Sequence, residues 1–79
     1  ALRPTPDGSP GALVAAVEPG SPAERAGLQP GMVVVEAGRA PVEDPASLVA
    51  RLRDAKPGEA VLLRVEQQGQ RGLRALAMP

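Results

Sequence analysis

The sequence predicts one small domain of five to six β-strands, one short helix and one longer helix. Three observations lead to this prediction: turn and capping signals crowd into residues 18–34, an apolar stripe of helical period runs over 45–55, and apolar residues alternate over 59–66. The chain has 79 residues, which is the size of a single domain. We therefore place the whole of 1–79 in one unit.

The short helix is predicted from the segment that follows Glu18. Pro19-Gly20 suits the centre of a type II turn, because proline fixes φ near −65° and glycine accepts a positive φ. Ser21 and Glu24 have the spacing of a capping box, and proline at 22 is well placed at the first helical position. Gly27 suits the left-handed residue after a helix. We predict a helix over 22–26.

Strands are predicted on both sides of this helix. Residues 12–18 are apolar on both faces, which predicts a buried strand, and a turn at Pro30-Gly31 leads into a second strand over 32–37. Residues 1–3 suit the end of a further strand, and the Pro- and Gly-rich segment 4–11 suits a loop. Residues 38–41 are predicted to form a turn.

The longer helix is predicted over 45–55. Asp44 suits an N-cap and Pro45 suits the first helical residue. Leu48, Leu52 and Ala55 fall on one stripe, with Pro45 and Val49 on its flanks. Pro57-Gly58 ends the helix. After it, 59–66 and 71–78 are predicted to pair as a hairpin around Gln68-Gly69, with the side chains of 61, 63 and 65 facing inward.

The composition excludes several functional classes. The chain contains no Phe, Tyr, Trp, Cys or His, so it offers no base-stacking surface, no thiol nucleophile, no Ser-His-Asp triad and no zinc finger. Its formal net charge is +0, with basic and acidic residues interspersed. We therefore expect no nucleic-acid partner, no membrane insertion, no metal, no cofactor and no catalytic residue of its own. Ser21 is explained as a helix cap, and no base is present to activate it.

Four segments together resemble a PDZ domain. They are Gly11-Ala-Leu-Val, the Pro-Gly-Ser-Pro-Ala-x-x-Ala-Gly-Leu-x-Pro-Gly run over 19–31, Gly-Arg-x-Pro-Val over 38–42, and Lys-Pro-Gly over 56–58. The pattern is similar to the bacterial, circularly permuted type, and most similar to the second PDZ domain of HtrA/Do-type periplasmic serine proteases. It departs from the family at Met32 and at Ala37-Gly38, where family members usually carry Asp and Asn-Gly. The resemblance implies a small, partly open β-barrel or sandwich.

The resemblance also implies where a ligand binds. In PDZ domains a peptide adds a strand to an exposed sheet edge beside a helix. The edge here is the run ending at 1–3, and the carboxylate-binding loop is expected immediately before Ala1, outside this sequence. By the same resemblance the candidate peptide-binding residues come from this run and from the longer helix: Leu2, Arg3, Pro45, Val49, Leu52 and Arg53.

Each of these residues also has a purely structural interpretation. Any amphipathic helix needs a core-facing stripe, which suits Leu48 and Leu52, and Leu2 suits the core as well as a pocket. Arg53 equally suits a solvated surface position. The sequence leaves these alternatives open.

The function that the resemblance implies is a non-catalytic module that binds carboxyl-terminal or extended apolar segments of misfolded proteins. Its host would be a serine protease of the periplasm or cell envelope, and the isolated domain is expected to be a monomer. One alternative is a structural or oligomerisation domain that binds no peptide. Another is a PDZ domain of a different bacterial envelope protease or secretion component.

Overall fold

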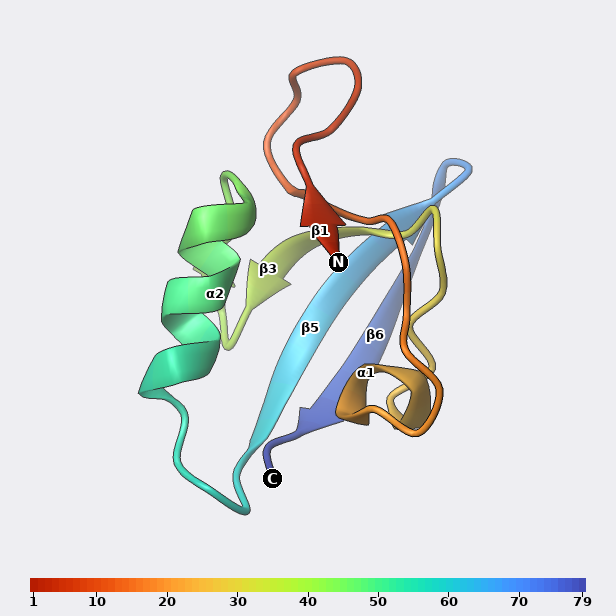
Figure 1. Cartoon of the computed structure of the whole chain (residues 1–79). Coiled ribbons are helices and arrows are strands. Elements are labelled where there is room, and N and C mark those ends of the chain that lie inside the picture. Colours follow the sequence, from red (N-terminus) through yellow and green to blue (C-terminus); the bar gives the residue numbers. More distant parts are fainter.

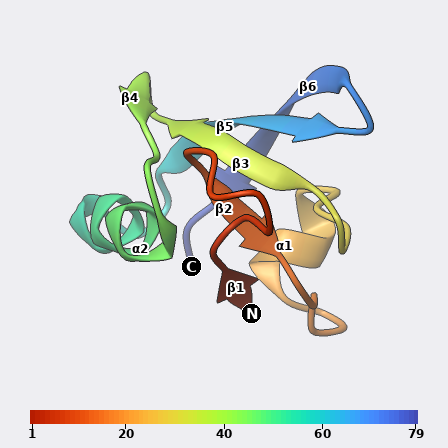
Figure 2. The same cartoon turned by 90° about the horizontal axis from the view of Figure 1, so that it is seen from above.

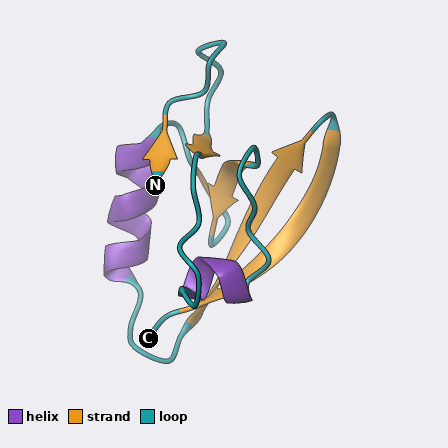
Figure 3. Cartoon of the chain, turned by 45° about the vertical axis from the view of Figure 1, so that its right-hand side comes forward, coloured by secondary structure: helices purple, strands orange, loops and turns teal.

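The computed structural model describes all 79 residues as one sheet of six strands and two helices (Figures 1 and 3). The sequence-based prediction of the fold class is thereby confirmed. The elements in chain order are β1 (Leu2–Arg3), β2 (Ala12–Val14), α1 (Pro22–Arg25), β3 (Val33–Ala37), β4 (Ala40–Pro41), α2 (Pro45–Asp54), β5 (Ala60–Gln67) and β6 (Gln70–Ala77).

The strands pair in the order β1-β2-β3-β5-β6, with β4 added to β3, and every pairing is antiparallel. Seen from above, β2 and β1 lie between the two helices, which are on the same side of β3 (Figure 2). β1 and β6 are thus the two ends of the main strand order, and the two-residue β4 lies off it. They face different surroundings, because β1 runs beside α2 whereas α1 contacts β6.

The core is built from aliphatic side chains alone. Its central members come from the sheet and from α2, and the partly buried Leu52 and Leu2 pack against them. No aromatic ring is available, so small side chains from several elements must fill the interior together. The buried hydrophobic residues are Ala12, Val14, Leu28, Met32, Val34, Ala37, Val42, Leu48, Leu63, Val65 and Leu76.

Helix α1 is held at both ends by its own local hydrogen bonds. Ser21 caps it by accepting from the Glu24 N–H at 3.3 Å, but the Glu24 carboxylate accepts from the Gly20 N–H rather than from Ser21. The predicted capping box is therefore wrong in one of its two bonds, because the Ser21 N–H already donates to Glu18. At the other end Gly27 has φ +85°, and Leu28 donates to Ala23 in a Schellman arrangement.

Helix α2 begins as predicted and ends one residue early. The Asp44 carboxylate accepts from the Ser47 N–H at 2.8 Å, and the Ser47 hydroxyl accepts from the Asp44 N–H at 3.2 Å. These two bonds form a capping box. Ala55 leaves helical geometry at ψ 141°. Leu48 is the only buried residue of the helix, so most residues of α2 are in contact with solvent.

Two predictions about the first half of the sheet are corrected. The strand predicted over 12–18 ends at Val14, and Ala16 and Glu18 are exposed. Beyond Val14, Ala1 alone continues the pairing, by accepting from the Ala15 N–H and donating to the Ala16 carbonyl, and the ladder does not reach Glu18. The turn predicted over 38–41 is narrower than expected. Its last two residues form β4, which pairs with Glu36 and Ala37 of β3, and the turn itself is Gly38-Arg39 with positive φ at both residues.

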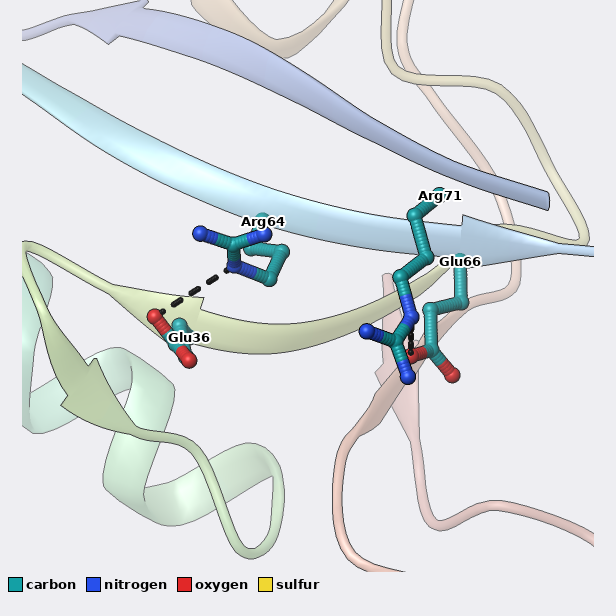
Figure 4. Close-up of polar contacts among 4 residues, drawn as sticks. All are labelled: Glu36, Arg64, Glu66 and Arg71. Atoms are coloured by element: carbon teal, nitrogen blue, oxygen red, sulfur yellow. Dashed lines mark ion pairs between the residues drawn. The ribbon is translucent and has the colours of Figure 1, made fainter.

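The β5–β6 hairpin follows the predicted alternation. Leu63 and Val65 are buried, whereas Leu62 on the opposite face is 50% exposed. Gln68 and Gly69 have φ of +51° and +77°, which suits the predicted two-residue turn. The outer face carries two ion pairs, Arg64–Glu36 at 3.5 Å and Arg71–Glu66 at 3.3 Å (Figure 4). Both are exposed, and such pairs contribute only about 0–1 kcal/mol each.

Candidate functional site

A groove of about 660 Å³ runs between β1 and α2, which lie side by side in Figure 1. Its lining is apolar except at Arg53, and it is contributed entirely by these two elements and the residue before β1. The groove is open along its length and holds no side chain with nucleophilic or acid–base chemistry. Its lining residues are Ala1, Leu2, Pro45, Ala46, Val49, Ala50 and Arg53.

One wall of the groove is an unpaired strand edge. β1 pairs only with β2, with Leu2 opposite Val14. Ala1 directs its carbonyl toward β2, where it accepts from the Ala15 N–H at 2.8 Å. Backbone groups of an antiparallel strand alternate between its two sides, so the N–H and C=O of Leu2 face the other way, into the groove. Such unpaired groups are a template for pairing with another chain.

The other wall is fixed by a few specific contacts. The residue Leu48 is only 2% exposed and packs α2 against the core. Its neighbour Val49 is 36% exposed and lines the groove. The start of the helix is tied to the loop after β1, because Gly11 donates to the carbonyl of Glu43 at 3.1 Å. Gly11 has φ +138°, and a Cβ there would lie 2.6 Å from Val33 Cγ1. The loop between β1 and β2 therefore packs too closely at Gly11 for any other residue.

A second pocket of about 160 Å³ lies next to the groove and shares Ala1 and Leu2 with it. Every residue that lines it is hydrophobic, including Leu52 from the last turn of α2. An enclosed apolar space of this kind suits an aliphatic side chain. The lining residues are Ala1, Leu2, Val14, Ala16, Val17, Ala23, Leu28, Val34, Leu48, Leu52, Leu63 and Leu76.

The structure brings most of the predicted site residues together. Leu2, Pro45, Val49 and Arg53 line the same groove, and Leu52 lines the pocket beside it. Arg3 is exposed and lines neither. Whether these residues contact a ligand stays a prediction.

Sequence reasoning missed the small residues of the groove. Ala46 and Ala50 line it but were not proposed, although they stand one helical turn apart and next to Val49. The helical spacing 46, 49, 50 and 53 was a usable signal. The two alanines themselves give no signal for a site, because alanine is equally common on any helix surface.

A polar hollow of about 410 Å³ lies on the other side of the loop after β1, against the tip of the β5–β6 hairpin. In it the Ser9 hydroxyl and the Ser9 N–H donate to the Asp7 carboxylate at 2.7 and 3.0 Å. These hydrogen bonds, the side-chain one foremost, lower the pKa of Asp7 below 3.8. The bonds stabilise the loop itself. The structure contains no group of three or more His, Cys, Asp or Glu side chains placed to hold a metal ion, and neither helix is long and apolar enough to cross a membrane.

The fold leaves an unpaired sheet edge open beside a helix, which is the architecture of a small binding module. The family model for the PDZ domain matches residues 13–67, and the chain belongs to this family. A PDZ domain is a binding module and not a catalytic domain.

Solved structures extend this assignment. The PDZ domain of HtrA3 bound to a phage-derived ligand, FGRWV, has a TM-score of 0.84 and 28% identity over 98% of this chain and 78% of that one. The HtrA-type protease AlgW with a decapeptide has a TM-score of 0.78 and 27% identity, and the match covers 85% of this chain but only 20% of the protease. No curated protein matches the sequence. The sequence-based identification as a PDZ domain similar to those of HtrA proteases is confirmed.

Proposed function

We propose that this domain binds the carboxyl-terminal or extended segments of other polypeptides by strand addition in the groove between β1 and α2. The observation that carries the proposal is the unpaired edge at Leu2, which faces an apolar groove of about 660 Å³. Two similar structures carry peptide ligands, FGRWV and a decapeptide, which supports the same use of this chain.

In the proposed complex the ligand runs antiparallel to β1. The N–H and C=O of Leu2 exchange hydrogen bonds with one ligand residue, whose side chain then faces α2 at Val49 and Pro45. The ligand's carboxyl end lies toward Ala1, because the two strands run in opposite directions. Arg53 lines the groove together with Ala1 and is its only charged side chain. A carboxylate at this end is attracted by the guanidinium.

The apolar lining sets the proposed side-chain preference. The pocket that contains Leu52 accepts an aliphatic residue near the ligand's carboxyl end, and the alanines at 46 and 50 leave room along the helix. No hydroxyl, amide or carboxylate lines the groove to favour a polar ligand side chain. The domain is therefore proposed to favour apolar termini, such as those exposed by misfolded proteins.

The proposed host is a serine protease of the HtrA type in the bacterial cell envelope. In it this chain is the second PDZ domain and presents substrates to the protease domain. The similarity to the HtrA3 and AlgW structures supports this setting.

The proposal is tested by titrating ¹⁵N-labelled domain with the peptide FGRWV, once with a free carboxylate and once as the amide. We expect amide shifts at Leu2 and Val49, with weaker binding of the amide form because Arg53 loses its partner. Val49→Ala is expected to raise Kd about 3- to 10-fold, because it removes apolar contact in the groove. Leu62→Ala is the matched control, since Leu62 is also exposed but lies on the outer face of β5. Unchanged shifts at Leu2 and Val49 with both peptides would overturn the proposal.

A further inference from the structure

The free edge of β1 stops soon after Leu2, on the side where the ligand's amino end would lie. Leu2 faces the groove, so the next residue that faces the same side is two positions along, at Pro4. Proline has no backbone N–H. A ligand residue opposite Pro4 is able to donate to its carbonyl but receives no hydrogen bond in return.

The chain also turns away from the groove after this residue. The groove is lined by Ala1 and Leu2 but not by Arg3 or any residue that follows it in β1 or its loop. Thr5 is buried and its hydroxyl donates to the Ser9 carbonyl, while the Gly8 N–H donates to the Thr5 carbonyl. These bonds commit the segment after Pro4 to a compact loop. Arg3 itself stays extended in β1, as expected for a residue before proline.

We infer that Pro4 ends strand addition and so acts as a specificity-determining residue that limits recognition to a short segment of ligand. The inference rests on the proposed function of the groove. From Leu2 onward a ligand exchanges a complete pair of hydrogen bonds at Leu2 and at no later residue of the edge, and its residues upstream of the one opposite Pro4 gain nothing from the edge. The groove thus selects short, end-docked segments and rejects long strands, such as the edge of another sheet, which draw their affinity from a continuous ladder.

The test measures Kd for peptides of increasing length that all end in RWV. The series is acetyl-RWV, acetyl-GRWV, acetyl-FGRWV, and acetyl-FGRWV lengthened at its amino end by one to four alanines. The proteins are the wild-type domain, Pro4→Ala and Pro6→Ala, each checked by thermal unfolding. Pro4→Ala restores one backbone donor at the edge, whereas Pro6→Ala restores a donor within the loop.

For Pro4→Ala we expect affinity equal to wild type with the shortest peptides and about 2- to 10-fold tighter with the longer ones, the effect of one added hydrogen bond. Pro6→Ala is expected to match wild type at every length. Equal affinity of Pro4→Ala and wild type at all lengths, or the same ratio at all lengths, would overturn the inference. If no peptide binds the wild-type domain, the proposed function fails and this inference fails with it.

A second measurement uses the wild-type domain alone and so does not depend on the folding of a variant. Each backbone amide of the longest peptide is N-methylated in turn. We expect large losses of affinity within one run of three residues at most, and changes below 2-fold at all amides upstream of that run. Losses above 5-fold that continue farther upstream would show an extended ladder and contradict the inference.

Discussion

The two end strands of the main strand order, β1 and β6, both leave backbone groups unpaired, but the surroundings of these groups differ. β1 is two residues long, and its free side presents the N–H and C=O of Leu2 to an apolar groove. β6 is eight residues long and carries more unpaired backbone than β1 does. On length alone, β6 would be the better template for a foreign strand.

One side chain covers a carbonyl in the middle of the β6 edge. Leu73 lies opposite Arg64 at a position that does not exchange hydrogen bonds with β5, so its carbonyl faces the free side of the sheet. The Arg74 guanidinium donates to this carbonyl at 2.9 Å and also to the Gly27 carbonyl at 3.4 Å, at the end of α1. The same cation thus occupies the strand edge and joins it to a helix. The comparison teaches that what lies beside a strand, more than its length, decides whether its edge is available.

The two helices differ in the same way. α1 has four residues, none of them buried, and is held by its caps and by Arg74 against β6. α2 has ten residues but depends on Leu48 for its buried contact with the core, and it leaves a groove between itself and β1. A helix that is attached along a narrow line leaves one side free to serve as the wall of a site.

The largest effect is expected from Leu48→Ala. Leu48 is 2% exposed, and losing a buried leucine side chain costs about 2–5 kcal/mol of unfolding free energy. Because Leu48 is the anchor of α2, amide hydrogen exchange should accelerate in α2 and around Leu2 more than in the β5–β6 hairpin. Chemical denaturation and hydrogen exchange measure the two parts of this prediction.

Val49→Ala is the matched control for that experiment. Val49 is the next residue on the same helix but is 36% exposed, so we expect it to cost less than about 1 kcal/mol. Equal losses of stability in the two variants would contradict the view that one side chain anchors the groove wall.

A smaller effect is expected from Arg74→Ala, which uncovers the Leu73 carbonyl on the β6 edge. Loss of the hydrogen bonds to Leu73 and Gly27 should cost about 0.5–1.5 kcal/mol. The freed carbonyl belongs to Leu73, whose side chain is 51% exposed, so the variant should self-associate more than the wild type at the same concentration. Sedimentation velocity across a concentration series measures this.

Arg71→Ala separates charge from edge protection. Arg71 lies on the same strand, but it pairs with Glu66 and covers no edge carbonyl. Removing it takes away one positive charge as Arg74→Ala does, and it should leave the association state unchanged. Self-association of Arg71→Ala to the same extent would show that lost charge, and not the opened edge, is responsible.

The sequence predicts those helices, turns and strands whose formation depends on signals within a few residues. The caps at Ser21 and Asp44, the turn at Gln68-Gly69 and the alternation over 59–66 each depend on neighbours within a few residues, and the structure confirms these elements. The failures occur where a partner distant in the chain decides. β2 stops at Val14 because, beyond it, Ala1 is the one residue of a neighbouring strand segment that offers backbone partners. β4 is a local exception, since its partners Glu36 and Ala37 lie just before it, across the two-residue turn Gly38-Arg39.

The groove residues show the same difference between features that local sequence predicts and features that tertiary packing sets. Pro45 and Val49 were proposed because a helix stripe has flanks that can be counted along the sequence, and they do line the groove. Arg3 was proposed as part of the edge strand, but whether its side chain points into the groove depends on which face of β1 Leu2 takes. The distance between β1 and α2 that makes room for a ligand is a property of tertiary packing, with no local sequence signal.

The smallest expected effect is a pH dependence confined to the loop after β1. The hydrogen bonds from Ser9 lower the pKa of Asp7 in the folded domain, so the stabilisation they bring is complete above the ordinary pKa of 3.8 and is lost as pH falls through the lowered value. The Ser9 amide shift, followed from pH 7 to pH 2, should titrate with a midpoint below 3.8. In Asp7→Asn this titration should vanish. A midpoint at or above the ordinary value would mean that Ser9 does not hold the carboxylate in solution. The amides of β6 should show no matching transition, because no carboxylate accepts a hydrogen bond from a backbone N–H of that strand. A midpoint shared with Ser9 would mean that β6 and the loop after β1 do not respond to pH independently.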